Sequence, residues 1–142
     1  MAAALLSGTA AAETHTIEVT FTNIESTTGL IWASLCTEAE FENLGEEPCG
    51  FLGRVDAEEG AEMTFENIPS GTYAISAFHD SNANQRLDFN SRGIPDEPTG
   101  NSGNARGFFG PPAFSQMKFT LRDRNAGRPR TFKIKMMTND IP

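Results

Sequence analysis

Short runs of alternating apolar and polar residues are the feature of this sequence that most restricts its fold. In the segment 16–22, Ile17, Val19 and Phe21 alternate with threonine and glutamate, as expected of a strand with one buried face. Similar alternation recurs over 62–67, 72–79, 117–122 and 132–136. Because successive side chains of a strand point to opposite faces of a sheet, this pattern indicates short strands that each cover one side of a core.

Two further segments complete the expected set of strands. Residues 29–36 are apolar on both faces, which suits a central strand, and 51–57 is a weaker candidate. Between them, Thr37 and Glu40 form a capping-box pair that predicts a short helix ending near Leu44. The sequence therefore predicts an all-β fold, an antiparallel β-sandwich of about seven strands with one short helix and one long ordered loop.

The length of 142 residues allows one domain, which we expect to span 13–142. A chain of this size buries enough surface to need no second copy for its core, so we expect a monomer. Residues 1–12 carry no charge and end in three alanines, which fits signal-peptide cleavage before Glu13. We interpret them as a signal-peptide remnant; the alternative is an alanine-rich tail. No other apolar run approaches the length of a transmembrane segment, so we expect a periplasmic or secreted protein.

The two cysteines fit an oxidising compartment. Cys36 and Cys49 are close enough in sequence to form one disulfide around a short loop. The alternative is a pair of buried free thiols.

The net charge of −8 is unevenly distributed. Residues 13–66 contain thirteen acids and one base, whereas 118–135 contains seven bases and one acid. An acidic protein is a poor ligand for nucleic acid, and we exclude that class of partner. The basic stretch either lies beside the acidic strands of the same fold, is solvated, or contacts an anionic surface.

The segment 80–112 has almost no periodicity and is unusually long for a loop in a compact domain. Oxygen-bearing side chains recur in it at positions 1, 3, 5 and 9, with a backbone carbonyl at position 7, which is the spacing of a calcium-binding loop. The predicted calcium ligands are Asp80, Asn82, Asn84, Arg86 (through its carbonyl oxygen) and Asp88.

The loop departs from the EF-hand pattern at two positions. Gln85 replaces the expected glycine, and Ser91 replaces the final glutamate, so Asp96 or Glu97 would have to supply further oxygens. We therefore expect weak calcium binding, with a Kd of about 10⁻⁴ to 10⁻³ M. The alternative is that the Asp and Asn side chains cap turns through backbone amides.

Three other residues invite a functional interpretation. His79 precedes Asp80 at the end of a predicted strand, and we favour a hydrogen-bonded histidine at the border of the loop over a catalytic one. Phe108 and Phe109 either form an exposed docking patch or fold back to fill the edge of the sandwich, which we favour.

Part of the chain resembles an exported bacterial family known as domain of unknown function 2141. The matching segments are Phe65–Ile75 (FENIPSGTYAI), Phe78–Asn84 (FHDSNAN), Leu87-Asp88, Gly93–Pro98 (GIPDEP) and Asn104–Pro112 (NARGFFGPP). The first of these is also similar to a turn of transthyretin-like and carboxypeptidase-regulatory-like sandwiches. The resemblance implies an Ig-like or prealbumin-like fold, and it implies no activity.

Three classes of function remain open at this point. The leading hypothesis is a non-catalytic binding or accessory module with a calcium-organised loop, whose partner is an envelope protein or a glycan. The second is a metal-dependent hydrolase that uses His79, Asp80 and loop carboxylates. The third is a structural protein of the cell envelope.

Overall fold

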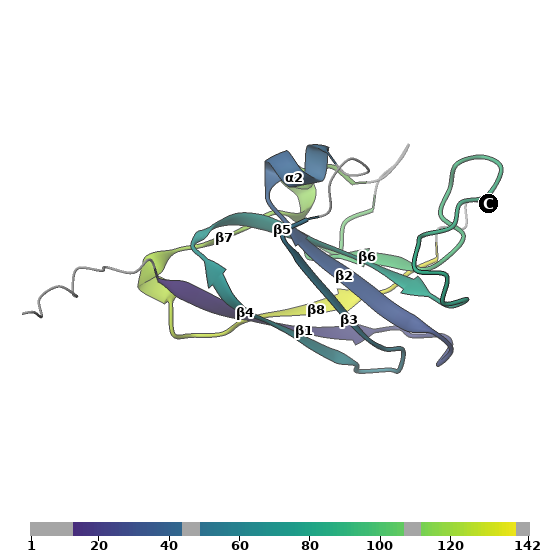
Figure 1. Cartoon of the computed structure of the whole chain (residues 1–142), viewed down its shortest axis with the longest axis horizontal. Coiled ribbons are helices and arrows are strands. Elements are labelled where there is room, and N and C mark those ends of the chain that lie inside the picture. The colour runs from purple at the N-terminus through teal and green to yellow at the C-terminus, as the bar shows by residue number, and fades with distance from the viewer. Residues whose placement is uncertain (1–12, 44–48, 107–111, 139–142) are drawn as a thin grey trace, which may run out of the picture.

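Eight strands form two packed sheets in the computed structural model, which describes residues 13–43, 49–106 and 112–138 (Figure 1). One sheet has the order β4-β1-β8, and the other has the order β3-β2-β5-β6, with β7 also paired to β5. The first sheet contains β1 (Thr14–Thr22), β4 (Glu62–Pro69) and β8 (Arg130–Lys135). The second contains β2 (Leu30–Cys36), β3 (Phe51–Asp56), β5 (Gly71–Asp80), β6 (Thr99–Asn101) and β7 (Phe119–Leu121). The all-β prediction is confirmed, and the proposed signal-peptide remnant 1–12 lies outside the described residues.

The core lies between the inner faces of the two sheets. Its largest cluster includes the alternating residues of β1, namely Ile17, Val19 and Phe21, which are all buried. Ile31 and Leu35 of β2 face them from the other sheet. The period-two pattern read from the sequence therefore corresponds to the buried side of each sheet.

The sandwich is not wholly antiparallel. Strand β1 pairs antiparallel with β4 and parallel with β8, for example through Val19 opposite Phe132. Alternation specifies which side chains face the core but not the direction of the neighbouring strand, so the sequence could not reveal this pair. The pairing places the basic C-terminal strand directly beside β1.

The two sheets are joined along one side of the sandwich. Thr99 of β6 and Met137, just after β8, exchange two backbone hydrogen bonds of 2.9 Å. The Asn104 side chain adds two more, donating to the Lys133 carbonyl at 3.0 Å and accepting from the Lys135 N–H at 2.9 Å. Strand β6 itself lies within the segment for which the sequence predicted no regular structure.

Helix α2 (Glu38–Glu42) begins as predicted. The Thr37 side chain accepts from the Glu40 N–H, and the Glu40 carboxylate accepts from the Thr37 N–H at 2.9 Å. Two other helical turns were not predicted, α3 (Phe114–Met117) and the 3₁₀ turn η1 (Asp123–Asn125). In α3, Phe114 and Met117 pack with Ala74 of β5 on the outer face of its sheet, and the Gln116 side chain accepts from the Ala113 N–H at 2.8 Å. Tertiary packing therefore contributes to the position of this turn.

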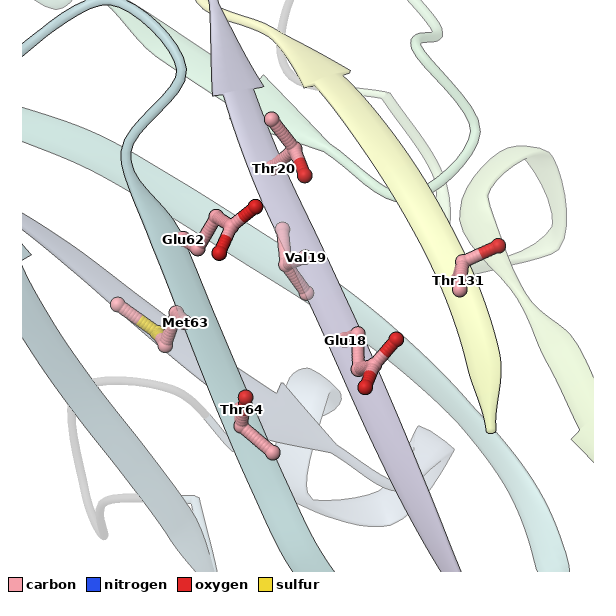
Figure 2. Close-up of a pocket in the computed structure, with 7 residues that line it drawn as sticks. All are labelled: Glu18, Val19, Thr20, Glu62, Met63, Thr64 and Thr131. Atoms are coloured by element: carbon pink, nitrogen blue, oxygen red, sulfur yellow. The ribbon is translucent and has the colours of Figure 1, made fainter. Parts of the chain in front are cut away.

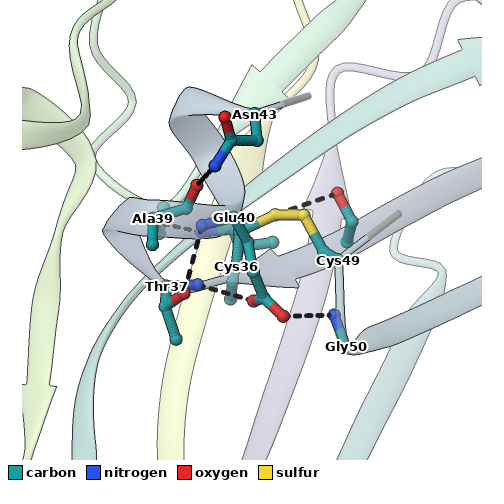
Figure 3. The surroundings of a disulfide bond; sticks show 10 residues. Cys36, Thr37, Ala39, Glu40, Asn43, Cys49 and Gly50 are labelled. Carbon is teal, nitrogen blue, oxygen red and sulfur yellow. Dashed lines mark hydrogen bonds between the residues drawn. A yellow bond between two sulfur atoms is a disulfide. The ribbon is translucent and has the colours of Figure 1, made fainter. Parts of the chain in front are cut away.

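A disulfide joins Cys36 and Cys49, as predicted, with their Cα atoms 5.1 Å apart. Figure 3 shows how Glu40 reinforces it: the second carboxylate oxygen accepts from the Gly50 N–H at 3.0 Å. One side chain thus holds both the start of α2 and the chain that returns to β3. The alternative of two free thiols is excluded.

None of the helices in the described residues is long and apolar enough to cross a membrane.

Candidate functional site

The loop after β5 is organised from its first residue, Asp80, whose side chain is fully buried. One carboxylate oxygen accepts from the Asn84 N–H at 3.1 Å. The other accepts from the Gln85 N–H at 2.8 Å and from the indole N–H of Trp32 at 3.2 Å. A buried carboxylate is costly unless such donors surround it, and here three of them do. Asp80 therefore caps the first turn of the loop and ties it to β2.

Glu97 closes the far end of the same loop. Its carboxylate is buried and accepts from the Ser81 N–H at 3.0 Å and from the Asp88 N–H at 3.2 Å. The N–H of Asp96 donates to the Asp88 carbonyl at 2.8 Å. Residues 80–97 are consequently cross-linked at both ends by buried carboxylates that bind main-chain amides.

Three side chains meet on the exposed side of this loop, and we call Asn82, Asn84 and Asp88 the outer cluster. The Asp88 carboxylate accepts from the Asn82 amide at 2.8 Å and from the Asn84 amide at 2.9 and 3.0 Å. These hydrogen bonds stabilise the charged form and hold the pKa of Asp88 below its ordinary value. The nearby charge of Arg86 acts in the same direction.

The five predicted calcium ligands are thus brought into one hydrogen-bonded network. The outer cluster is in direct contact, Asp80 joins it through the Asn84 backbone, and the Arg86 N–H donates to the Asn84 side chain at 3.1 Å. Gln85, in the place of the expected glycine, adopts a left-handed φ of 68°. Nowhere in the described ranges do three His, Cys, Asp or Glu side chains gather to hold a metal. A cation in this loop would therefore need amide and carbonyl oxygens as well.

His79 is buried beside the loop, with its Nε2 2.7 Å from the carbonyl oxygen of Thr28. Since a carbonyl oxygen only accepts, this ring nitrogen carries the proton and donates it. This geometry is that of a hydrogen-bonded histidine bordering the loop. The other predicted contacts, Phe108 and Phe109, lie outside the described residues.

Two contacts in the structure have no signal in the sequence. Trp32 meets Asp80 across 48 positions of chain. His15 lies with its Nε2 2.9 Å from the Ser70 hydroxyl, which in turn donates to Asp123. Because the single hydroxyl proton goes to Asp123, His15 donates to Ser70 and does not accept from it. This order is the reverse of a serine nucleophile activated by histidine, in which the base takes the hydroxyl proton.

A shallow pocket lies elsewhere, on the outer face of the β4-β1-β8 sheet (Figure 2). Its residues come from three adjacent strands and are Glu18, Val19, Thr20, Glu62, Met63, Thr64 and Thr131. Glu18 and Glu62 lie diagonally across β1 and β4, since Glu18 pairs with Thr64 and Thr20 with Glu62. The lining combines two carboxylates and three threonines with Val19 and Met63.

Residues 19–128 match the model of a family described as an uncharacterized protein conserved in bacteria (DUF2141). The match covers more than half of the chain and includes the whole of the loop 80–97. We find no significant match among curated proteins or among solved structures.

Proposed function

This chain belongs to the DUF2141 family, and we propose that it is an exported, non-catalytic binding or accessory module whose loop 80–97 is organised in part by calcium. The observation that supports this most directly is the state of the loop itself. Buried Asp80 and Glu97 hold its backbone in one conformation while the outer cluster faces solvent. A loop ordered before binding loses less conformational entropy when a ligand arrives, as a binding module requires.

The same hydrogen bonds argue against the hydrolase alternative. A general base needs a free lone pair within reach of substrate. Asp80 accepts three N–H donors, Glu97 accepts at both oxygens, and His79 donates to a backbone carbonyl while almost wholly buried. The two residues that this alternative names individually, His79 and Asp80, are therefore buried and hydrogen-bonded within the fold, which favours the binding module.

Calcium would bind at the outer cluster. The O and N atoms of an asparagine amide are assigned from its hydrogen bonds, and a cation reverses that preference. Turning the amides of Asn82 and Asn84 would direct two carbonyl oxygens toward the position now occupied by their N–H groups, beside the Asp88 carboxylate. The turn would break the hydrogen bonds that these oxygens now accept from the Asn84 and Arg86 N–H groups, which also makes binding weak. The backbone carbonyl of Arg86 would add a further oxygen ligand. With so few charged ligands, the site should be weak and should prefer calcium, which tolerates irregular geometry, to magnesium.

Trp32 offers a direct test, because it is the only tryptophan and its indole lies 3.2 Å from Asp80 at the base of the loop. Titration with calcium should change its fluorescence saturably, and magnesium should do so less. At ten times the Kd, calcium should add about 1.4 kcal/mol to the free energy of unfolding. Asp88→Asn should abolish both effects, and Glu66→Gln, which neutralises an exposed carboxylate outside the loop, should leave them intact. An equal response of the wild type and Asp88→Asn would refute the calcium site.

Export to the periplasm or beyond is supported by the disulfide, since such bonds rarely persist in the cytosol. Cells quenched in acid and treated with a thiol-alkylating reagent should yield protein with neither cysteine modified. Full modification of both would place the protein in a reducing compartment. The ligand of the module is then an envelope protein or a glycan, which cross-linking in intact cells and a glycan array would distinguish.

A further inference from the structure

Strand β3 forms one edge of the larger sheet, with β2 as its only paired strand within the described residues (Figure 1). Which of its backbone groups face β2 follows from the alternation of an antiparallel ladder. The Ala57 N–H donates to the Gly29 carbonyl, and Gly29 and Ala57 continue the β2–β3 register. Residues 51, 53 and 55 therefore also bond to β2, and residues 52, 54 and 56 direct their N–H and C=O groups outward.

The opposite side of the sheet gives the same result. The backbone N–H of His79 donates to the Pro98 carbonyl, and the Ile75 carbonyl accepts from the Ser102 N–H. The backbone groups of the odd-numbered residues of β5 therefore point toward β6. The backbone groups of the even-numbered residues of β5 consequently point toward β2. Following the same alternation across β2 again shows that the groups of residues 52, 54 and 56 point away from β2. Leu52, Arg54 and Asp56 thus direct three N–H and three C=O groups outward. Because no other strand in the described ranges pairs with these groups, they form an open edge.

The side chains of these three residues are also exposed. Leu52 is 62% exposed and is one of two large apolar side chains so exposed in the described part of the chain. Arg54 and Asp56 carry opposite charges two positions apart, with the Arg54 guanidinium over the Trp32 ring. Edge strands usually resist pairing through like charges, proline or a covering segment. This edge instead carries a self-complementary pair of charges.

We propose that the β3 edge binds the β3 edge of a second copy of this chain, antiparallel and centred on Val55. This register places Arg54 of each copy opposite Asp56 of the other, in two symmetry-related hydrogen-bonded pairs that also join the charges. If the pairing were centred on Arg54, the Arg54 residues of the two copies would lie opposite each other. If it were centred on Gly53, Arg54 of each copy would lie opposite Leu52 of the other. Charge therefore selects one register among those that the outward groups allow.

The association should be weak and reversible. One edge pair buries far less than the roughly 1,200 Å² of a stable interface, and both copies carry a net charge of −8. The core of each copy is complete without the contact, so dissociation leaves folded monomers. The inference is independent of the calcium proposal, because the contact uses strand β3 and the outer cluster lies in the loop after β5.

Charge reversal provides the test, by sedimentation velocity over a range of concentrations at constant salt. The wild type should self-associate, and Arg54→Asp and Asp56→Arg alone should each lose this association through like-charge repulsion. An equimolar mixture of these two variants should associate, with a Kd about tenfold or more below that of either alone, since each pair is then complementary. The double reversal Arg54→Asp/Asp56→Arg should associate as the wild type does.

A backbone variant separates the edge from its charges. Arg54→Pro removes the charge and also an outward N–H that makes no bond to β2, whereas Arg54→Gln removes the charge alone. Arg54→Pro should therefore weaken association more than Arg54→Gln does, while circular dichroism shows the folded sheet in both. If the wild type remains monomeric at every concentration, the proposal is overturned. The β3 edge would then be available to pair with an extended segment of another protein. Association that is equal in both single-reversal variants overturns it as well, because the contact then lies elsewhere.

Discussion

Gly29, just before β2, packs against the backbone at the start of the loop 80–97. Its φ is +76°, and an added Cβ would lie 2.0 Å from the carbonyl oxygen of Asp80. Gly60 has a similar φ of +81° with open space around it. The two glycines therefore share a conformational requirement and differ in packing.

Alanine at these positions should separate the two effects. We expect Gly60→Ala to cost about 1–2 kcal/mol of stability, the penalty for a left-handed alanine. Gly29→Ala should cost about 1–3 kcal/mol more, because backbone must also move. Urea denaturation of both variants measures the difference in their free energies of unfolding. Equal losses of stability would show that the backbone at Asp80 moves away from the added Cβ without a measurable loss of free energy.

The pKa of the Tyr73 hydroxyl depends on how deeply this side chain is buried. Its hydroxyl donates to the Pro69 carbonyl at 2.8 Å, and burial raises its pKa above 10.0, with the negative charge of Glu40 adding to the effect. A raised folded-state pKa contributes stability that is complete below the ordinary pKa and is lost as the pH rises through the folded value.

Because Tyr73 is the only tyrosine, ultraviolet absorbance of the phenolate titrates it alone. Glu40→Gln should lower the pKa of Tyr73 but leave it above the ordinary value, since burial is the larger cause. Glu38→Gln, on the exposed side of the same helix, should not change it. A pKa unaffected by Glu40→Gln would contradict the electrostatic contribution.

At the scale of elements, the sequence predicted what depends on local pattern. The alternation of Ile17, Val19 and Phe21 identified β1, and the Thr37–Glu40 pair identified the start of α2. It missed α3, whose position depends on packing against Ala74 of a distant strand. For the candidate site it predicted the residues that gather in the loop, but not the Asp80–Trp32 contact, because no local pattern records a partner 48 positions away.

The disulfide and the capping box hold one element between them, and their contributions should differ in size. We expect Cys36→Ala/Cys49→Ala to lower the free energy of unfolding by about 2–5 kcal/mol, mainly because the unfolded chain gains freedom. Thr37→Ala should cost about 1 kcal/mol. Guanidinium unfolding compares them, and a disulfide effect no larger than that of the cap would mean that the reduced loop stays closed on its own.

At the scale of the whole molecule, the two sides of the sandwich differ. On one side the β6–β8 seam links the sheets through Thr99, Met137 and the side chain of Asn104. On the other side β3 has an open edge, with no second paired strand among residues 13–43, 49–106 and 112–138. The seam also covers part of the backbone of β8, which is otherwise an edge of the smaller sheet.

Asn104 allows the seam to be tested without backbone strain. Its φ is +48°, which glycine adopts readily, so Asn104→Gly removes the two side-chain hydrogen bonds and little else. We expect a loss of about 1–3 kcal/mol, from two bonds of ordinary strength, and faster hydrogen exchange at the Lys135 amide. Unchanged exchange at that amide would show that water or another group replaces the asparagine.

The parallel pairing of β1 with β8 also bears on the order in which the molecule is made. Strand β1 receives its second neighbour only when β8 becomes available, more than a hundred residues later. A chain that emerges from its N-terminal end therefore holds Phe21 without the cover of β8 until residues 130–135 have also emerged. Pairing between such distant segments also slows folding. Native structure should consequently appear late and at once rather than strand by strand.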